Sequence, residues 1–101
     1  MPRSWLLTVD GKHEVVDWAH EEVNAMMGGT ITFVGAIDDL QVFVLALAYS
    51  DKLYVNPFCT DCDVFMHLPV RGSVIFIATD KDGDPIDVDV EAVKSRLHIT
   101  I

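Results

Sequence analysis

The sequence predicts an α+β domain with a mainly antiparallel sheet, in the order β-α-β-β-β-loop-β-α. Three observations lead to this prediction. The chain has 101 residues, half of them hydrophobic, which suits one domain over residues 1–101 with a modest core. Short segments rich in β-branched and aromatic residues alternate with brief turn sequences. Two other segments carry apolar residues at helical spacing.

The N-terminal part predicts a strand followed by a helix. Residues 5–9 form an apolar segment that ends at the turn signal Asp10-Gly11. Asp17 is expected to cap the helix and Gly28-Gly29 to end it, because glycine adopts left-handed backbone at low cost. The helix is predicted from apolar residues at spacings of three and four: Val16, Ala19, Val23 and Met26.

The middle of the chain predicts strands and one long loop. Residues 30–37 and 73–79 are β-branched and aromatic, as strands are. Residues 42–49 form a continuous apolar run, which predicts a strand inside the sheet and covered on both faces. Residues 53–56 predict a short strand that stops before a proline. Residues 58–71 lack periodicity and predict a loop.

The C-terminal part predicts a turn and a helix. Residues 80–85 are a turn, in which Asp82-Gly83 supplies left-handed backbone. The alternation of apolar and acidic residues after Pro85 is also compatible with a strand, but that strand would place three acids on one face. A helix over residues 88–97 turns those acids into caps and dipole partners, and it is the structure we expect.

The charge balance limits the classes of partner. Sixteen acids against seven bases give a formal charge of −9 and a pI near 4.5. This balance argues against direct binding to nucleic acid or to an anionic membrane. The simplest explanation of the acidity is that it keeps the protein soluble. The functional explanation is that an acidic face binds a basic protein partner. We expect a cytoplasmic protein, because the longest apolar run has eight residues and a membrane-spanning helix needs roughly 20.

Cys59 and Cys62 are the first candidate site. Two thiols at this spacing can ligate zinc, and His67 follows at the spacing of a third ligand. The fourth ligand of a zinc knuckle is missing, because Gly72 occupies its position. A dithiol redox pair and two inert loop cysteines are the alternatives.

An acidic row is the second candidate site. Asp80, Asp82 and Asp84, with Glu91 further along, match much of a calcium-loop pattern. Pro85 stands where that loop requires glycine, so a tight turn is the favoured interpretation.

The sequence predicts no catalytic centre. The four histidines, His13, His20, His67 and His98, have no nucleophile at a helpful spacing, and we expect His13 to lie in a turn. We therefore expect a protein that is not an enzyme. A small-ligand pocket is still open as an alternative. It would lie in the loop after Asn56, with Lys52 and Arg71 as anion contacts.

The chain resembles a family of roughly 100-residue proteins carried by phages and plasmids. The helix ending at Gly28-Gly29 and the strand after it carry the resemblance, together with residues 53–56, 71–77 and 80–83. It covers about residues 5–93. The family is a domain of unknown function, so the resemblance implies a viral or mobile-element context and no chemistry.

Three hypotheses about function follow. The first is a small, acidic, non-enzymatic accessory protein that binds a host or viral macromolecule, with a protein as the expected partner. A homodimer is also expected, because a small sheet has edge strands that must be covered. The second is a protein that sequesters a nucleotide-like ligand or a metabolite. The third is a structural module supported by a metal, zinc before calcium.

Overall fold

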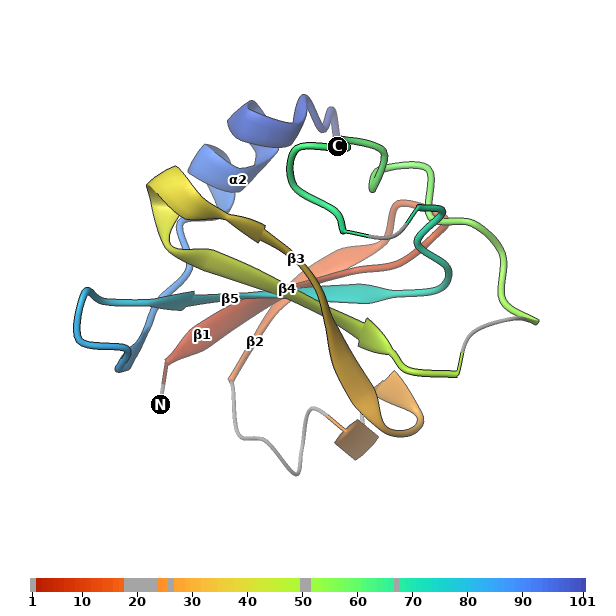
Figure 1. Cartoon of the computed structure of the whole chain (residues 1–101), viewed down its shortest axis with the longest axis horizontal. Helices are drawn as coiled ribbons and strands as arrows, with labels where there is room; N and C mark the ends of the chain where they lie inside the picture. Colours follow the sequence, from red (N-terminus) through yellow and green to blue (C-terminus); the bar gives the residue numbers. More distant parts are fainter. Residues whose placement is uncertain (1, 18–23, 26, 50–51, 67) are drawn as a thin grey trace.

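Hydrophobic strands assemble into one antiparallel sheet with the strand order β2-β1-β5-β4-β3 (Figure 1). The computed structural model describes residues 2–17, 24–25, 27–49, 52–66 and 68–101. All strand pairs in this sheet are antiparallel, so the predicted α+β class is confirmed. The strands are β1 (Arg3–Leu7), β2 (His13–Asp17), β3 (Ile31–Ile37), β4 (Val42–Leu47), β5 (Val74–Thr79) and β6 (Pro85–Ile86).

The two strands inside the sheet are the most apolar. β5 occupies the middle, between β1 and β4, and its residues Val74, Ile75 and Phe76 are completely buried. β4 is paired on both sides, as its continuous apolar run predicts, and it ends at Leu47. The predicted strand over residues 73–79 corresponds closely to β5, because a β-branched run of this kind packs well on both faces of a sheet.

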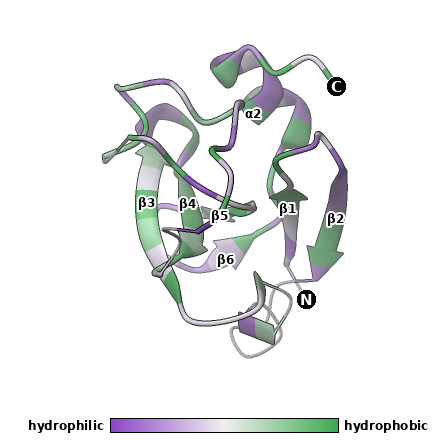
Figure 2. Ribbon diagram, turned by 90° about the vertical axis from the view of Figure 1, so that its right-hand side faces the viewer, coloured by the Kyte–Doolittle hydropathy of each residue, from purple (hydrophilic) through white to green (hydrophobic). Residues whose placement is uncertain are grey.

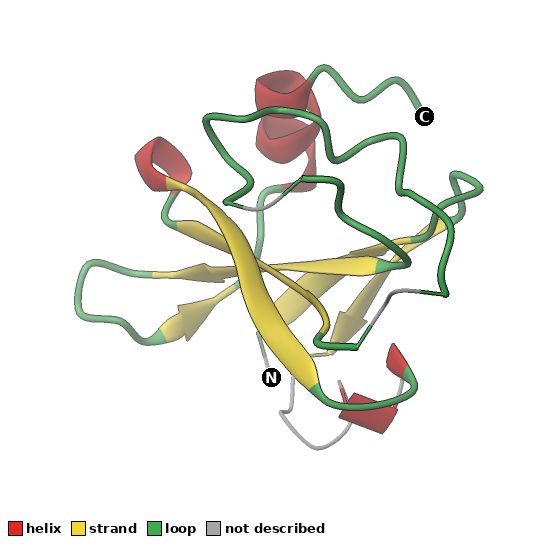
Figure 3. Ribbon diagram, turned by 45° about the vertical axis from the view of Figure 1, so that its right-hand side comes forward, coloured by secondary structure: helices red, strands yellow, loops and turns green. Residues whose placement is uncertain are grey.

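Strands β3 and β4 are largely hydrophobic (Figure 2). The apolar side chains form two clusters, one on each face of the sheet. On one face, Trp5 and Phe76 lie with ring centroids 5.3 Å apart beneath the helix α2 (Val90–Leu97), which contributes Val93. The long loop between β4 and β5 runs over the same face (Figure 3). On the other face, Ile75 packs with Met27. The larger core therefore lies between the sheet, the loop and α2.

Helix α2 (Val90–Leu97) confirms the C-terminal prediction. Asp89 caps it, since its carboxylate accepts a 3.1 Å hydrogen bond from the backbone N–H of Ala92. The helix buries Val93 and Leu97 against the sheet and ends at His98, whose φ is 57°. Asp89 thus serves as the cap, and Glu91 lies in the first turn as a dipole partner.

The first predicted helix is only partly correct. Asn24, Ala25 and Met27 are helical, and the glycine pair ends the turn, with N–H groups of Gly28 and Gly29 donating to the carbonyl of Asn24. The predicted start is wrong, because Val16 and Asp17 belong to strand β2, in register with β1. His13 opens that strand and does not lie in a turn. Ala19, His20, Val23 and Met26 lie outside the described residues.

Two smaller predictions also need correction. The first strand is Arg3–Leu7, two residues earlier than expected. The segment 53–56 is not a strand: it forms one isolated bridge, between Val55 and Arg71. The short helix η1 (Asp38–Leu40) connects β3 to β4. No helix formed by the described residues is long and apolar enough to cross a membrane.

Candidate functional site

Asn56 organises the long loop from within. Its side chain is completely buried. Its Nδ2 donates a 3.0 Å hydrogen bond to the carbonyl of Gly72, and its Oδ1 accepts one of 3.0 Å from the N–H of Phe58. Both polar ends of the amide therefore hold the loop, and the contact with a ligand that the sequence suggested for Asn56 stays a prediction.

The two predicted anion contacts, Arg71 and Lys52, have different surroundings. The Arg71 guanidinium donates to the carbonyl of Leu53 at 3.0 Å, and this bond ties the two ends of the loop together. Lys52 is exposed and borders a hollow of about 300 Å³ with Leu47, Tyr49 and Leu53. The structure assigns Asn56 and Arg71 to holding the loop, and Lys52 to a largely apolar surface.

The cysteines occupy different environments. Cys59 is buried in the core, and Cys62 is exposed. Burial raises the pKa of the Cys59 thiol to about 12 and so disfavours the thiolate that zinc binding and redox exchange use. His67 lies outside the described residues. Within the described part of the chain, no three His, Cys, Asp or Glu side chains are grouped to hold a metal.

The acidic row forms a hydrogen-bonded turn between β5 and β6. The Asp80 carboxylate accepts bonds from the N–H groups of Asp82 and Asp84, at 2.9 and 3.0 Å. Gly83 has a φ of 86° and donates to the carbonyl of Asp80. Glu91 lies on α2 and pairs with Lys94 at 3.6 Å. The predicted tight turn is therefore present, and its first carboxylate is occupied by backbone N–H groups.

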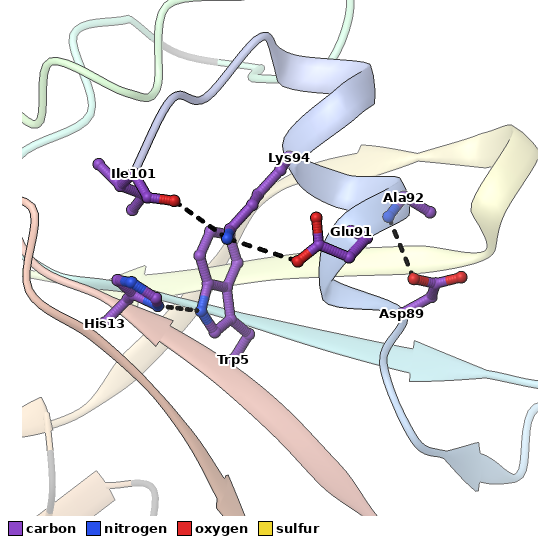
Figure 4. A network of polar contacts seen from close by, with 7 residues as sticks. All are labelled: Trp5, His13, Asp89, Glu91, Ala92, Lys94 and Ile101. Atoms are coloured by element: carbon purple, nitrogen blue, oxygen red, sulfur yellow. Dashed lines mark hydrogen bonds and ion pairs between the residues drawn. The ribbon is translucent and has the colours of Figure 1, made fainter.

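A second polar arrangement lies where β1 meets β2 (Figure 4). The buried Trp5 donates from Nε1 to Nδ1 of His13 at 3.2 Å, and the two rings meet edge to face at 5.7 Å. On α2, the Nζ of Lys94 donates a 3.1 Å hydrogen bond to the carbonyl of Ile101. Sequence reasoning did not pair Trp5 with His13, because the hairpin register that brings them together was not predicted.

The feature that stands out chemically is one end of the sheet, which carries half of the chain's acids. We call residues 38–41 and 79–91 the acidic end. It contains one lysine, Lys81, and eight of the sixteen acidic side chains. These are Asp38, Asp39, Asp80, Asp82, Asp84, Asp87, Asp89 and Glu91.

The topology brings the two segments of the acidic end together. β4 begins opposite the end of β5, since Val42 pairs with Ala78 and Thr79 donates from its N–H to the carbonyl of Gln41. The β3–β4 connection therefore lies beside the β5–β6 turn, at the left of Figure 1. Asp87, which follows β6, connects the acidic end to β1, because its carboxylate accepts a hydrogen bond from the N–H of Arg3 at 2.9 Å.

A hollow of about 290 Å³ lies between these segments. Apolar side chains of β3 and β4, including Ile37 and Phe43, form part of its lining, and Asp38, Asp80 and Lys81 border it. Among the described residues, Glu91 is the one acid of this end that takes part in an ion pair. The other seven carboxylates face solvent or accept backbone N–H bonds, so their charge is not neutralised within the described chain.

Comparison with known proteins adds no relative. No family model, no curated protein and no solved structure matches this chain. The resemblance to the phage and plasmid family remains a prediction from the sequence.

Proposed function

We propose that the chain is a non-enzymatic accessory protein that binds a basic protein segment through the acidic end. The observation that carries this proposal is the set of carboxylates without an ion-pair partner at this end of the described chain, two of which, Asp38 and Asp80, border a partly apolar hollow. A lysine or arginine side chain has the matching chemistry: an apolar stem and a cationic head. The resemblance to phage and plasmid proteins suggests that the partner is a host or viral macromolecule.

The charge of this end also favours fast capture of a basic partner. The negative carboxylates of the acidic end attract a cationic partner over distances of about 10 Å, the Debye length at 0.1 M salt. Each exposed ion pair contributes little by itself, roughly 0.2–1 kcal/mol. Binding is therefore expected to need several contacts and to weaken as salt increases.

A pair of charge-matched variants tests the location of the site. Asp39→Asn with Asp82→Asn removes two exposed carboxylates from the acidic end. Glu14→Gln with Asp63→Asn removes two exposed carboxylates elsewhere and leaves the same net charge. Binding of a fluorescent oligoarginine peptide is measured by anisotropy at about 0.05 and 0.15 M salt.

We expect the first pair to weaken peptide binding about five-fold and the second pair less than about two-fold. Equal weakening by both pairs would mean that only the net charge matters, and the proposed site would be wrong. Absence of peptide binding at the lower salt concentration would reject the function itself.

A further inference from the structure

Strand β2 leaves one edge of the sheet open. Within the described residues it pairs with β1 alone, and its side chains are largely exposed, with Val15 at 49 %. An open edge offers a row of backbone donors and acceptors to another strand. The residues whose backbone N–H and C=O groups point outward therefore determine how another strand can pair with this edge.

The hydrogen-bond pattern identifies those residues. Thr8 donates from its N–H to the carbonyl of Lys12, so this pair faces inward across the hairpin. Arg3 uses its N–H for Asp87 and its carbonyl for Val88, on the side away from β2. Because backbone groups alternate along a strand, Glu14 and Val16 face β1. The outward N–H and C=O groups belong to His13, Val15 and Asp17.

We propose that two copies of the chain pair through β2, antiparallel and centred on Val15, to form one continuous sheet. In this register Val15 lies opposite Val15 of the second copy, and His13 lies opposite Asp17. All three outward residues then form hydrogen-bonded pairs, with about six main-chain hydrogen bonds in total. The arrangement is isologous, as a two-fold dimer requires.

The ring of His13 is already oriented for this contact. Its Nδ1 accepts the hydrogen bond from Trp5, so the neutral ring carries its proton on Nε2. That second nitrogen points away from Trp5 (Figure 4). Side chains directly opposite each other share a face, with Cβ atoms about 5 Å apart. Nε2–H of His13 therefore has the carboxylate of Asp17 on the second copy as its acceptor, twice in each dimer.

The overall charge is compatible with this geometry. Arg3 lies opposite Asp17 in the hairpin and contacts Asp87, so the acidic end lies beyond the Asp17 end of β2. Antiparallel pairing sends the two acidic ends to opposite ends of the shared sheet. Each copy still carries a formal charge of −9, so the dimer is expected to become tighter as salt screens this repulsion.

Two measurements on the unmodified protein test the proposal. Sedimentation equilibrium is expected to show a dimer with a Kd on the order of 10–100 µM, typical of a small interface, and tighter at higher salt. Amide exchange followed by NMR is expected to slow with protein concentration at His13, Val15 and Asp17. The inward amides of Glu14 and Val16 serve as the internal control, because β1 protects them at every concentration.

Two sets of variants test the register. Val15→Pro removes an outward N–H without removing a bond to β1, whereas Val15→Thr keeps it. The first is expected to abolish dimerisation and the second to leave Kd within about two-fold. Asp17→Lys is expected to raise Kd about ten-fold, and adding His13→Glu to restore it to within about three-fold, since the swapped charges face each other again.

A chain that stays monomeric up to millimolar concentration at high salt would overturn the proposal. So would a dimer that tolerates Val15→Pro, or an Asp17→Lys defect that His13→Glu does not repair. If Val15→Pro alters the fold, as circular dichroism would show, the charge swap still decides the register. The dimer and the acidic-end function can fail separately, because Asp39 and Asp82, the residues changed at the acidic end in the peptide assay, do not lie on β2.

Discussion

The two outer strands of the sheet differ in how their open sides are treated. The long loop covers β3 at Val34 and Ala36: Ala36 donates to the carbonyl of Val64, and Met66 donates to the carbonyl of Val34, both at 3.0 Å. β2 has no such cover within the described residues. The loop therefore protects one edge from pairing with another chain, and the other edge is left with an exposed row of donors and acceptors.

The covered edge depends on particular residues. Gly35 bridges Phe65, and the register of β3 with β4 shifts between Phe33 and Gly35. Gly35 has no side chain to keep the loop away, and Asn56 and Arg96 hold the loop from the inside and from α2. The bare edge is held by the pairing of β2 with β1 and by the hydrogen bond from Trp5 to His13. Substitutions on the covered edge should therefore cost more stability than those on the bare edge.

The largest effect is expected from Gly35→Ala. A Cβ at this position would lie 2.5 Å from the carbonyl oxygen of Val64, a backbone atom that cannot move without displacing the loop. We expect a loss of about 3 kcal/mol in the free energy of unfolding, measured by urea denaturation. Gly29→Ala is the matched control, because its Cβ meets Leu47 at an ordinary 3.4 Å. Similar losses for the two variants would show that the loop does not pack against Gly35.

The second effect is expected from Asn56→Ala. This change leaves the carbonyl of Gly72 and the N–H of Phe58 without their partner at a buried position, which costs about 2–3 kcal/mol. Thr60→Ala, at an exposed position in the same loop, should change stability by less than about 0.5 kcal/mol. The measurement is again urea denaturation. An Asn56→Ala protein as stable as the control would refute the anchoring role.

The third effect concerns the bare edge. His13→Ala removes the acceptor of the buried Trp5 N–H, and we expect a loss of about 1 kcal/mol because water can reach the exposed His13 position. His13→Gln supplies an amide oxygen and should recover part of this loss. Tryptophan fluorescence during denaturation reports both. If alanine and glutamine destabilise equally, the hydrogen bond does not contribute.

The contrast between the edges also shows what the sequence could predict. Local patterns sufficed for β5, for helix α2 with its Asp89 cap, and for the turn at Asp80, because each depends on neighbours in sequence. β2 was missed because Val16 fits both a helical stripe and a strand, and only pairing with β1 decides between them.

The sites were harder to predict for the same physical reason. Asn56 looks like a free polar residue until the loop folds around its amide, and Cys59 looks accessible until burial is known. The acidity of the chain was evident, but its gathering at one end was not. Predicting that the acids gather at one end requires the register of β4 with β5, which places Asp38 near Asp80. Acidic residues that are far apart in the sequence form one charged surface only because the strand pairing brings them together.

The smallest effect is a pH dependence at the contact between the covering loop and α2. Arg96 donates to Asp61 at 2.8 Å, and this hydrogen bond lowers the pKa of the Asp61 carboxyl below its ordinary value. A carboxyl with a lowered pKa in the folded state adds stability above the pKa of the unfolded state, about 3.9, and this contribution disappears as pH falls through the lowered value. The pair is partly exposed, so the contribution is small.

Arg96→Gln isolates this contribution. At pH 6 the variant should be slightly less stable than the wild type in urea denaturation. The difference should shrink below about pH 4 and vanish once Asp61 is protonated in both states. Lys94→Gln is the control from the same helix, since Lys94 pairs with Glu91 and donates to the carbonyl of Ile101. A difference for Arg96→Gln that stays constant down to low pH would mean that Arg96 acts through packing of its stem, and that the loop over β3 is held by Asn56 and Gly35 without help from this charge pair.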